Sequence, residues 1–357
     1  MNETLFMNSN DTTEVVLDVE TIPQPLIDLR AELESDDFMP KIVGQAPAKA
    51  QIKQRVKSYL RTRGYLAPIL LVAPRGYGKT VFTRGMGKRL LLSTHDQPKP
   101  FVEINGSTLK SVGAFIEVVS SYLAGPDGGG AEVTVFIDEV HSCDKKVRDF
   151  LLSFISPNGE GMCRVIHGGQ EFEINYRQLT LLMATTDAQK LTEAFKSRCN
   201  VIALNTYTKA EMAEVLNQYL DRSAKSYGLP RPTITEAVED DLVSVCRRTP
   251  RFAVKVADDL VQFCANEEQE AVDKKLFRKF VKAFDIHRYG LNRNELRVLQ
   301  ALHDGGAMTL NALAARVSIE RSMIQRDCEN ILHENGLIVI DGTRAITAKG
   351  REALAGW

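Results

Sequence analysis

The sequence has 357 residues, of which 44% are hydrophobic and 25% charged, a composition typical of a globular protein with room for two or three domains. No apolar run approaches the ~18 residues that a membrane-spanning helix needs, and the first residues lack the basic and apolar regions of a secretion signal. The six cysteines show no C-x-x-C spacing, which argues against a zinc site or a disulfide framework. We therefore expect a cytoplasmic protein that has no membrane partner.

The net charge of −1 conceals an asymmetry along the chain. Residues 1–37 contain ten acids and one base, a balance of −9, so the rest of the chain carries +8. This stretch has no sustained hydrophobic period, and we expect a mostly disordered or loosely docked acidic tail. Residues 38–63 contain seven bases and no acid, and they predict an amphipathic helix with a basic outer face. The pattern leaves open whether that face is solvated or faces a nucleotide or DNA.

A phosphate-binding loop is predicted directly after the short apolar strand at residues 69–72. Its pattern is G-x-x-x-x-G-K-[ST] with Ala73 in place of the first glycine, so the loop must turn there with negative φ or depend more on Gly76. Lys79 is expected to reach the terminal phosphates of ATP, and the Thr80 hydroxyl to ligate Mg²⁺. The expected nucleotide-binding residues are Ala73, Pro74, Arg75, Gly76, Tyr77, Gly78, Lys79, Thr80 and Val81.

Two further apolar strands end in polar residues. Residues 133–139 end in Asp138, which can hold the magnesium shell, and Glu139, which can polarise the attacking water. Residues 179–184 run into Thr185 and Thr186, whose side chains would lie beside the γ-phosphate if this strand sits between the other two. Residues 162–176 lie between these strands and predict a β-hairpin around Gly168-Gly169.

The last 150 residues change character. Helical patterns between residues 209 and 284 predict a compact helical subdomain. Spacing alone favours an ordinary surface charge for Arg251, in the first turn of one of these helices. From residue 290, three helices and a hairpin follow the winged-helix plan. That stretch has eight bases and eight acids, so docking of a protein remains an alternative to DNA binding. A local phosphate-contacting patch is expected from Arg321, Arg326, Arg344, Lys349 and Arg351.

In the order and spacing of these pieces, residues 38–357 resemble the RuvB family of Holliday-junction branch-migration motors, within the AAA+ ATPases. The resemblance implies a P-loop AAA+ core of the α/β class, a parallel sheet flanked by helices, over residues 38–205. It also implies a helical lid over residues 206–286 and a winged-helix DNA-binding domain over residues 287–357. The acidic tail is not part of the pattern. The matching stretches are 39–45, 73–80, 136–141, 162–176, 182–186, 249–252 and the winged helix from residue 290.

The resemblance also implies roles that spacing alone does not show. Thr186 corresponds to sensor 1, Arg198 to the arginine finger that enters the next subunit's ATP site, and Arg251 to sensor 2 in the lid. The hairpin at residues 162–176 resembles the one that docks RuvA, the junction-binding partner of the family. A hexameric ring on duplex DNA, with the winged helix touching the minor groove and backbone, completes these expectations.

The chain departs from the family at several positions. Ala73 and Arg75 replace the usual glycine and proline, Lys196 stands where a second arginine is common, and residues 197–199 resemble the finger of clamp-loader subunits. The leading interpretation is a DNA-translocating ATPase. The alternatives are a clamp-loader-like or recruiting ATP switch and a catalytically weak DNA-binding scaffold. Against the scaffold stand the intact residues Lys79, Thr80, Asp138, Glu139 and Arg198.

Overall fold

The computed structural model describes residues 29–36, 38–62, 64–88, 98–123 and 132–356. The chain divides into two compact units, residues 1–205 and residues 206–357, and each is described by itself. Most of the expected acidic tail and the glycine-rich stretch at residues 125–130 lie outside the described residues. The division falls after Asn205, where the sequence also indicates that the α/β portion ends.

The first unit is built on a parallel five-stranded sheet. Its three central strands are buried on both faces, as expected of a parallel sheet covered by helices on each side, and its two edge strands are only partly buried. β6 lies between β1 and β3, with Ile69 opposite Leu182 and Val133 opposite Leu179. The condition under which the sequence places Thr185 and Thr186 beside the γ-phosphate is therefore met. The strand order is β2 (Phe101–Asn105), β3 (Val133–Asp138), β6 (Leu179–Thr185), β1 (Ile69–Val72) and β7 (Asn200–Ala203).

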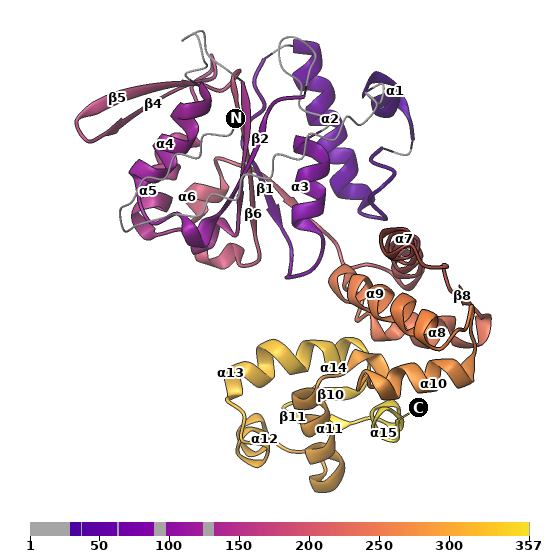
Figure 1. Ribbon diagram of the computed structural model, residues 1–357. Coiled ribbons are helices and arrows are strands. Elements are labelled where there is room, and N and C mark those ends of the chain that lie inside the picture. Colours follow the sequence, from indigo (N-terminus) through magenta and orange to yellow (C-terminus); the bar gives the residue numbers. More distant parts are fainter. Residues whose placement is uncertain (1–28, 37, 63, 89–97, 124–131, 357) are drawn as a thin grey trace, which may run out of the picture. The chain divides into compact units, whose positions relative to one another are not determined.

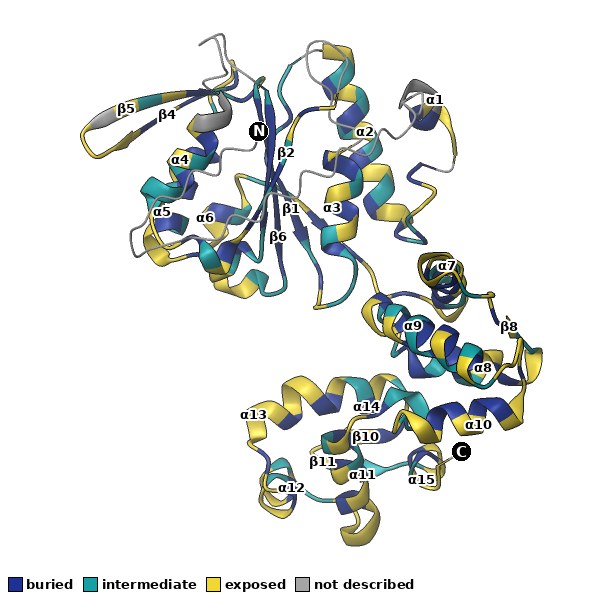
Figure 2. Ribbon diagram, viewed as in Figure 1, coloured by how far each residue is buried: buried dark blue, intermediate teal, exposed yellow. Residues whose placement is uncertain are grey.

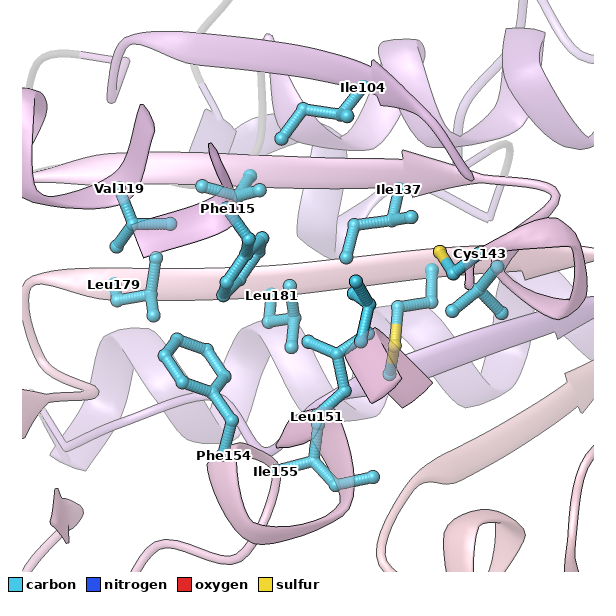
Figure 3. Close-up of a cluster of buried hydrophobic side chains, with 14 of the residues drawn as sticks. Ile104, Phe115, Val119, Ile137, Cys143, Leu151, Phe154, Ile155, Leu179 and Leu181 are labelled. Carbon is cyan, nitrogen blue, oxygen red and sulfur yellow. The ribbon is translucent and has the colours of Figure 1, made fainter. Parts of the chain in front are cut away.

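Helices cover both faces of this sheet and give the unit three layers (Figure 1). On one face, α2 (Ala46–Thr62) and α3 (Lys79–Gly87) bury Ile52, Val56, Phe82 and Met86. On the other, α4 (Val112–Leu123) and α5 (Lys145–Phe154) pack against the strands. Figure 3 shows this second core, where aromatic and aliphatic side chains meet: Phe115, Val119, Leu151, Phe154, Ile137 and Leu181. Short helical turns lie in the connections: η1 (Gly106–Thr108), η2 (Val140–Ser142), η3 (Ala188–Lys190) and α6 (Glu193–Lys196).

A short helix, α1 (Leu29–Glu34), lies in the stretch that we expected to be mostly disordered or loosely docked. Leu33 is buried in the same core as α2, and the buried Glu32 carboxylate accepts the backbone N–H of Met39 at 3.2 Å. Lys57 of α2 pairs with Glu34 at 2.9 Å, and Lys53 donates to the carbonyl of residue 35 at 2.7 Å. Of the two alternatives left open for the tail, residues 29–36 fit docking, because an apolar contact and two charged contacts hold them on α2.

The predicted hairpin is confirmed as β4 (Met162–His167) paired antiparallel with β5 (Gln170–Asn175). Gly168 and Gly169 form its turn, both with positive φ, as a two-residue hairpin turn requires. Its base is fixed in the core by Tyr176, whose hydroxyl donates to the Phe154 carbonyl at 2.7 Å. Much of its outer part is exposed (Figure 2), and Ile166 is 75% exposed, while the ring of His167 beside the turn lies 6.4 Å from that of Phe150 in α5.

The second unit begins with four helices, as predicted. They are α7 (Lys209–Tyr227), α8 (Glu236–Val245), α9 (Pro250–Asn266) and α10 (Lys274–Ala283), with two-residue strands β8 (Thr233–Ile234) and β9 (Ala271–Val272) in the connections. Local sequence explains the bounds of α7. Thr208 and Glu211 form a capping box at its start, and Gly228 ends it in the left-handed region.

A winged helix completes this unit, after the helical turn η4 (Arg288–Gly290). Its helices are α11 (Arg293–Gly305), α12 (Leu310–Val317) and a third that runs from α13 (Arg321–Met323) through the π-helical segment η5 (Ile324–Glu329) into α14 (Asn330–Glu334). The wing is β10 (Ile338–Asp341) with β11 (Thr343–Ile346). A final helix, α15 (Ala348–Leu354), was not predicted; it buries Ala353 in the same core. Among the described residues, no helix is both long and apolar enough to cross a membrane.

Candidate nucleotide-binding site

The predicted phosphate-binding loop connects β1 to α3. Ala73 is buried, its N–H donates to the Thr185 carbonyl at 3.3 Å, and its φ is not positive. Gly76 and Gly78 make the turn instead, each with φ of 87°. Gly78 is the N-cap residue of α3 and carries no side chain to occupy the first amides of that helix. Those amides and the helix dipole favour an anion at this position.

Lys79 opens α3 with a buried ammonium group. Its Nζ donates to the carbonyl of Ala73 at 2.9 Å and to that of Pro74 at 3.2 Å, and it lies 3.9 Å from Oε1 of Glu139. The lysine is thus held over the loop by the loop's own carbonyls. A phosphate in the loop would offer stronger, charge-assisted acceptors in the same region.

Thr80 and Asp138 meet where α3 begins and β3 ends. The Thr80 hydroxyl donates to Oδ2 of Asp138 at 2.8 Å, and Oδ1 accepts the N–H of Glu139 at 2.9 Å. A hydroxyl and a carboxylate oxygen at this spacing suit a hard divalent cation such as Mg²⁺. The donor set therefore fits the metal that the sequence predicted beside the phosphates.

Glu139 follows Asp138 in the left-handed region, with φ of 51°. Its Oε2 accepts two hydrogen bonds from Thr186, one from the backbone N–H at 3.0 Å and one from the hydroxyl at 2.8 Å. The contact arises because β3 and β6 are neighbours, so that their carboxyl ends emerge side by side. The structure thus brings together the carboxylate and the threonine that the sequence assigned to water activation and to sensor 1.

Two residues that the sequence analysis missed complete this corner. His141 Nδ1 lies 2.9 Å from the Thr185 hydroxyl and 3.2 Å from Oε2 of Glu139. Gly106, after β2, lies so close to the turn that a Cβ there would be 2.4 Å from the Glu139 carbonyl oxygen. Pairing of β2 with β3 creates this approach, and a glycine after a predicted strand is too common a signal to reveal it.

Asp187 lies at the edge of the site, directly after Thr186. Its pKa is lowered, chiefly by the hydrogen bond from Lys190; desolvation opposes this shift, and the charges of Lys190 and His141 add to it. Its backbone N–H donates to the Thr185 hydroxyl at 3.1 Å. This carboxylate therefore stays ionised and adds negative charge beside Thr185 and His141.

The expected arginine finger and the expected sensor 2 lie elsewhere. Arg198 follows α6 and is exposed, with its guanidinium donating to the Ala194 carbonyl at 2.6 Å. Arg251 is also exposed, in the first turn of α9, and belongs to the second unit. Lys79, Thr80, Asp138, Glu139 and Thr186 are the predicted site residues that the structure brings into direct contact.

The five expected phosphate-contacting bases of the winged helix differ in availability. Arg344 is committed to Glu329 at 2.6 Å, with 12% and 9% of the two side chains exposed, so it ties β11 to the third helix. Arg326 is exposed and paired with Asp327, and hydrogen bonding by that arginine lowers the pKa of the aspartate. The other three are exposed: Arg321 donates to Asn311, Lys349 lies over the Tyr289 ring, and Arg351 lies on α15.

Comparison with known proteins identifies both ends of this architecture. Residues 69–207 match the family "ATPase family associated with various cellular activities (AAA)", and residues 288–355 match the "RuvB C-terminal winged helix domain". Over 317 residues, the chain is 25% identical to the Holliday junction branch migration complex subunit RuvB of Mycoplasmopsis synoviae strain 53, covering 86% of this chain and 93% of that protein. The corresponding subunit of Pseudothermotoga lettingae is also 25% identical over 317 residues, covering 85% and 84%.

Solved structures agree in fold. The Thermotoga maritima RuvB branch migration motor superposes with a TM-score of 0.64 at 22% identity, covering 91% of this chain and 98% of that structure. A point mutant of the same protein gives 0.65 at 21% identity, covering 88% and 97%. At these identities the likeness establishes the order and arrangement of the elements within each unit.

Proposed function

We propose that this chain, a divergent RuvB-like AAA+ protein, hydrolyses ATP to drive movement along DNA. The observation that carries the proposal is the direct contact between the phosphate-binding loop and the two strand ends. Thr80 bonds Asp138, and Thr186 bonds Glu139, at the carboxyl edge of one parallel sheet. A ligand-binding loop, a cation site and a polarised carboxylate at one edge are the parts that phosphoryl transfer to water requires.

The loop residues bind and orient the phosphates. The amides at the start of α3 receive phosphate oxygens, and Lys79 exchanges its loop carbonyls for phosphate oxygens. Thr80 and Asp138 would hold Mg²⁺ by exchanging their mutual hydrogen bond for bonds to the cation. When bound, Mg²⁺ supplies positive charge that offsets the negative charge on the phosphate oxygens.

Glu139 takes the proton from the attacking water. One of its oxygens, Oε2, is engaged by Thr186 and His141, while Oε1 lies on the side of Lys79 at 3.9 Å. We therefore assign Oε1 as the atom that faces the water. The two hydrogen bonds from Thr186 fix the direction of the carboxylate, which is the positioning that general-base catalysis depends on.

A ring of identical subunits completes the site in this proposal. Arg198 is exposed beside a short helix, from where it can enter the nucleotide site of a neighbouring subunit as an arginine finger. Arg251 would contact the nucleotide from the lid. The curated name of the relatives, a subunit of a branch migration complex, supports an assembly, and the hexamer is the form that we propose. Cytoplasmic location remains a prediction of the sequence.

DNA is the proposed track, contacted by the winged helix. Four bases are exposed for phosphate contacts: Arg321, Arg326, Lys349 and Arg351. Arg344 would act indirectly, because its ion pair with Glu329 holds the wing against the third helix. A RuvA-like junction-binding protein is the proposed partner of the β4–β5 hairpin, whose exposed Ile166 offers an apolar contact.

One experiment tests this function. ATP turnover by the full chain is measured without DNA, with linear duplexes of increasing length and with a four-way junction. A translocating motor hydrolyses faster with DNA, and its rate rises with duplex length. Stimulation that is independent of length would indicate the loading switch instead. DNA binding without turnover would leave only the scaffold.

A further inference from the structure

The turn between α8 and α9 is tied to the winged helix by one arginine. Arg247 Nη2 donates to Oε1 of Glu295 at 2.5 Å, and Nη1 donates to the Gly290 carbonyl at 3.4 Å. The arginine side chain is 11% exposed and the glutamate side chain 0%. An arginine that makes two such bonds in a buried place fixes both partners in position, because neither the guanidinium nor the carboxylate is hydrated enough to exchange its partner for water.

The glutamate performs a second task at the same time. Its Oε2 accepts the N–H of Asn292 at 2.7 Å, while the Asn292 side chain accepts the N–H of Glu295, so the two form a capping box at the start of α11. One carboxylate thus joins the first helix of the winged helix to Arg247. The backbones also touch: a Cβ on Gly290 would lie 2.4 Å from the Val245 carbonyl oxygen.

The other side of Arg247 reaches the helix that carries Arg251. Its guanidinium lies over the Phe252 ring, 5.0 Å from the ring centre, and Phe252 follows Arg251 in the first turn of α9. Arg247 and Arg248 both have positive φ, 54° and 49°. Two successive non-glycine residues in this region are unfavourable and persist only where surrounding contacts hold them. A shift of the winged helix therefore moves the first turn of α9.

We propose that Arg247 is a positioning residue that couples the winged helix to Arg251, so that DNA held by the winged helix changes ATP turnover through the first turn of α9. The proposal rests on the proposed function, because it needs Arg251 to meet the nucleotide and the winged helix to meet DNA. It predicts that breaking the Arg247 contacts leaves both binding events intact and removes the communication between them.

The deciding variant is Arg247→Met with Glu295→Gln in the full chain. The double change leaves no buried charge without a partner, and the glutamine oxygen can still accept the Asn292 N–H and preserve the cap. The matched control is Arg248→Met, an adjacent exposed arginine with the same backbone conformation. Turnover without DNA, duplex affinity and the ratio of turnover with and without duplex are measured for each protein.

We expect the double variant to keep DNA-free turnover and duplex affinity within about twofold of the parent, while its stimulation ratio falls at least fourfold. Arg248→Met should keep all three values. Arg247→Lys, which retains the charge but loses the planar fork, should show an intermediate ratio. A purely structural role would instead lower turnover and affinity together, which would overturn the proposal.

An unchanged stimulation ratio in the double variant would overturn it equally. If the double variant does not fold, Arg247→Lys decides: a parental ratio in that protein refutes the coupling. A parental chain that shows no stimulation by DNA at all would refute the proposed function, and that result is seen before any variant is made. The two failures are therefore distinguishable.

Discussion

Thr186 donates two hydrogen bonds to a single oxygen of Glu139, one from its backbone N–H and one from its hydroxyl. The carboxylate is therefore held by the end of the neighbouring strand. A hydrogen bond to an ionised group contributes about 1.5–3 kcal/mol, so this pair resists rotation of the side chain. The arrangement fixes which oxygen of Glu139 is turned toward the loop and Lys79.

Glu139→Gln tests the role of this carboxylate. The change keeps Lys79, Thr80 and Asp138, so binding of ATP with Mg²⁺ should stay close to parental. Hydrolysis should slow by ~10² or more, because an amide cannot take the proton from water. Nucleotide affinity and steady-state turnover are the measurements. Parental turnover in this variant would show that Glu139 is not the base.

Gly106→Ala tests whether the turn after β2 positions Glu139. The new Cβ would meet backbone atoms of Glu139, which cannot rotate away as a side chain would, so the turn that carries the carboxylate must shift. Since a misplacement of ~1 Å can cost ~10² in rate, we expect turnover to fall at least tenfold with ATP affinity retained. Gly159→Ala is the matched control, since nothing lies within 4 Å of its Cβ. Equal turnover in the two variants would contradict the assignment.

Deletion of the acidic segment should depend on where the cut is made. Removing residues 1–28 takes away six acids and no base, so duplex binding should tighten at low salt and the gain should fade as salt screens the charges. Removing residues 1–37 also deletes α1 with the buried Leu33, and should lower the free energy of unfolding by at least ~2 kcal/mol. Binding isotherms at two salt concentrations and urea titrations measure both effects. Identical stability of the two truncated chains would show that α1 contributes nothing.

The finger is tested by mixing two inactive proteins. Arg198→Ala should bind ATP but hydrolyse it ~10³-fold or more slowly, because an arginine finger acts on the neighbouring subunit. Lys79→Ala should lose phosphate affinity in its own subunit. Mixed assemblies contain interfaces that join an intact loop to an intact finger, so part of the turnover should return. Co-assembly without any recovery would exclude Arg198 as a finger in trans.

The stability of Arg247→Met should depend on pH. Burial raises the pKa of Glu295, and Arg247 opposes that rise, so losing the arginine raises the pKa further. The folded variant then holds a proton that the unfolded chain releases at about pH 4.3, and stability is lost as pH rises from that value through the folded-state pKa. We expect a deficit of ~3 kcal/mol at pH 8 that is clearly smaller at pH 5. Urea unfolding at both pH values measures it, and the double variant with Glu295→Gln should lack this pH dependence.

Much of the nucleotide site can be predicted from short stretches of the sequence. Buried parallel strands appear as short apolar runs, and the residues that follow each run emerge at one edge of the sheet. For that reason Lys79, Asp138, Glu139 and Thr186 could all be assigned before the fold was known. The assignment of Thr186 depended on the strand order, because β6 had to lie between β1 and β3. The pairing of β6 with both strands meets that condition.

What the sequence could not supply depends on contacts between distant segments. The approach of Gly106 to the Glu139 carbonyl follows from strand register, and the partner of Arg344 is fifteen residues away across a turn. Helix α1 was missed because its few apolar residues show no period, although Leu33 is buried. Nothing in the local sequence pointed to Arg247, since its buried partner Glu295 lies 48 residues further along the chain.

The anchoring of the hairpin has a mechanical consequence. Tyr176 is fully buried and bonded to the end of α5, and only residues 177 and 178 separate it from β6. A protein bound to the hairpin is therefore connected to β6 through a short hydrogen-bonded turn at residues 175–178, within which Tyr176 is anchored in the core. The opposite end of that strand, about 20 Å away by strand geometry, is Thr185, which Thr186 follows. β6 thus connects the base of the hairpin at one end to the expected phosphate site at the other, so a force applied at the hairpin reaches that site along one strand.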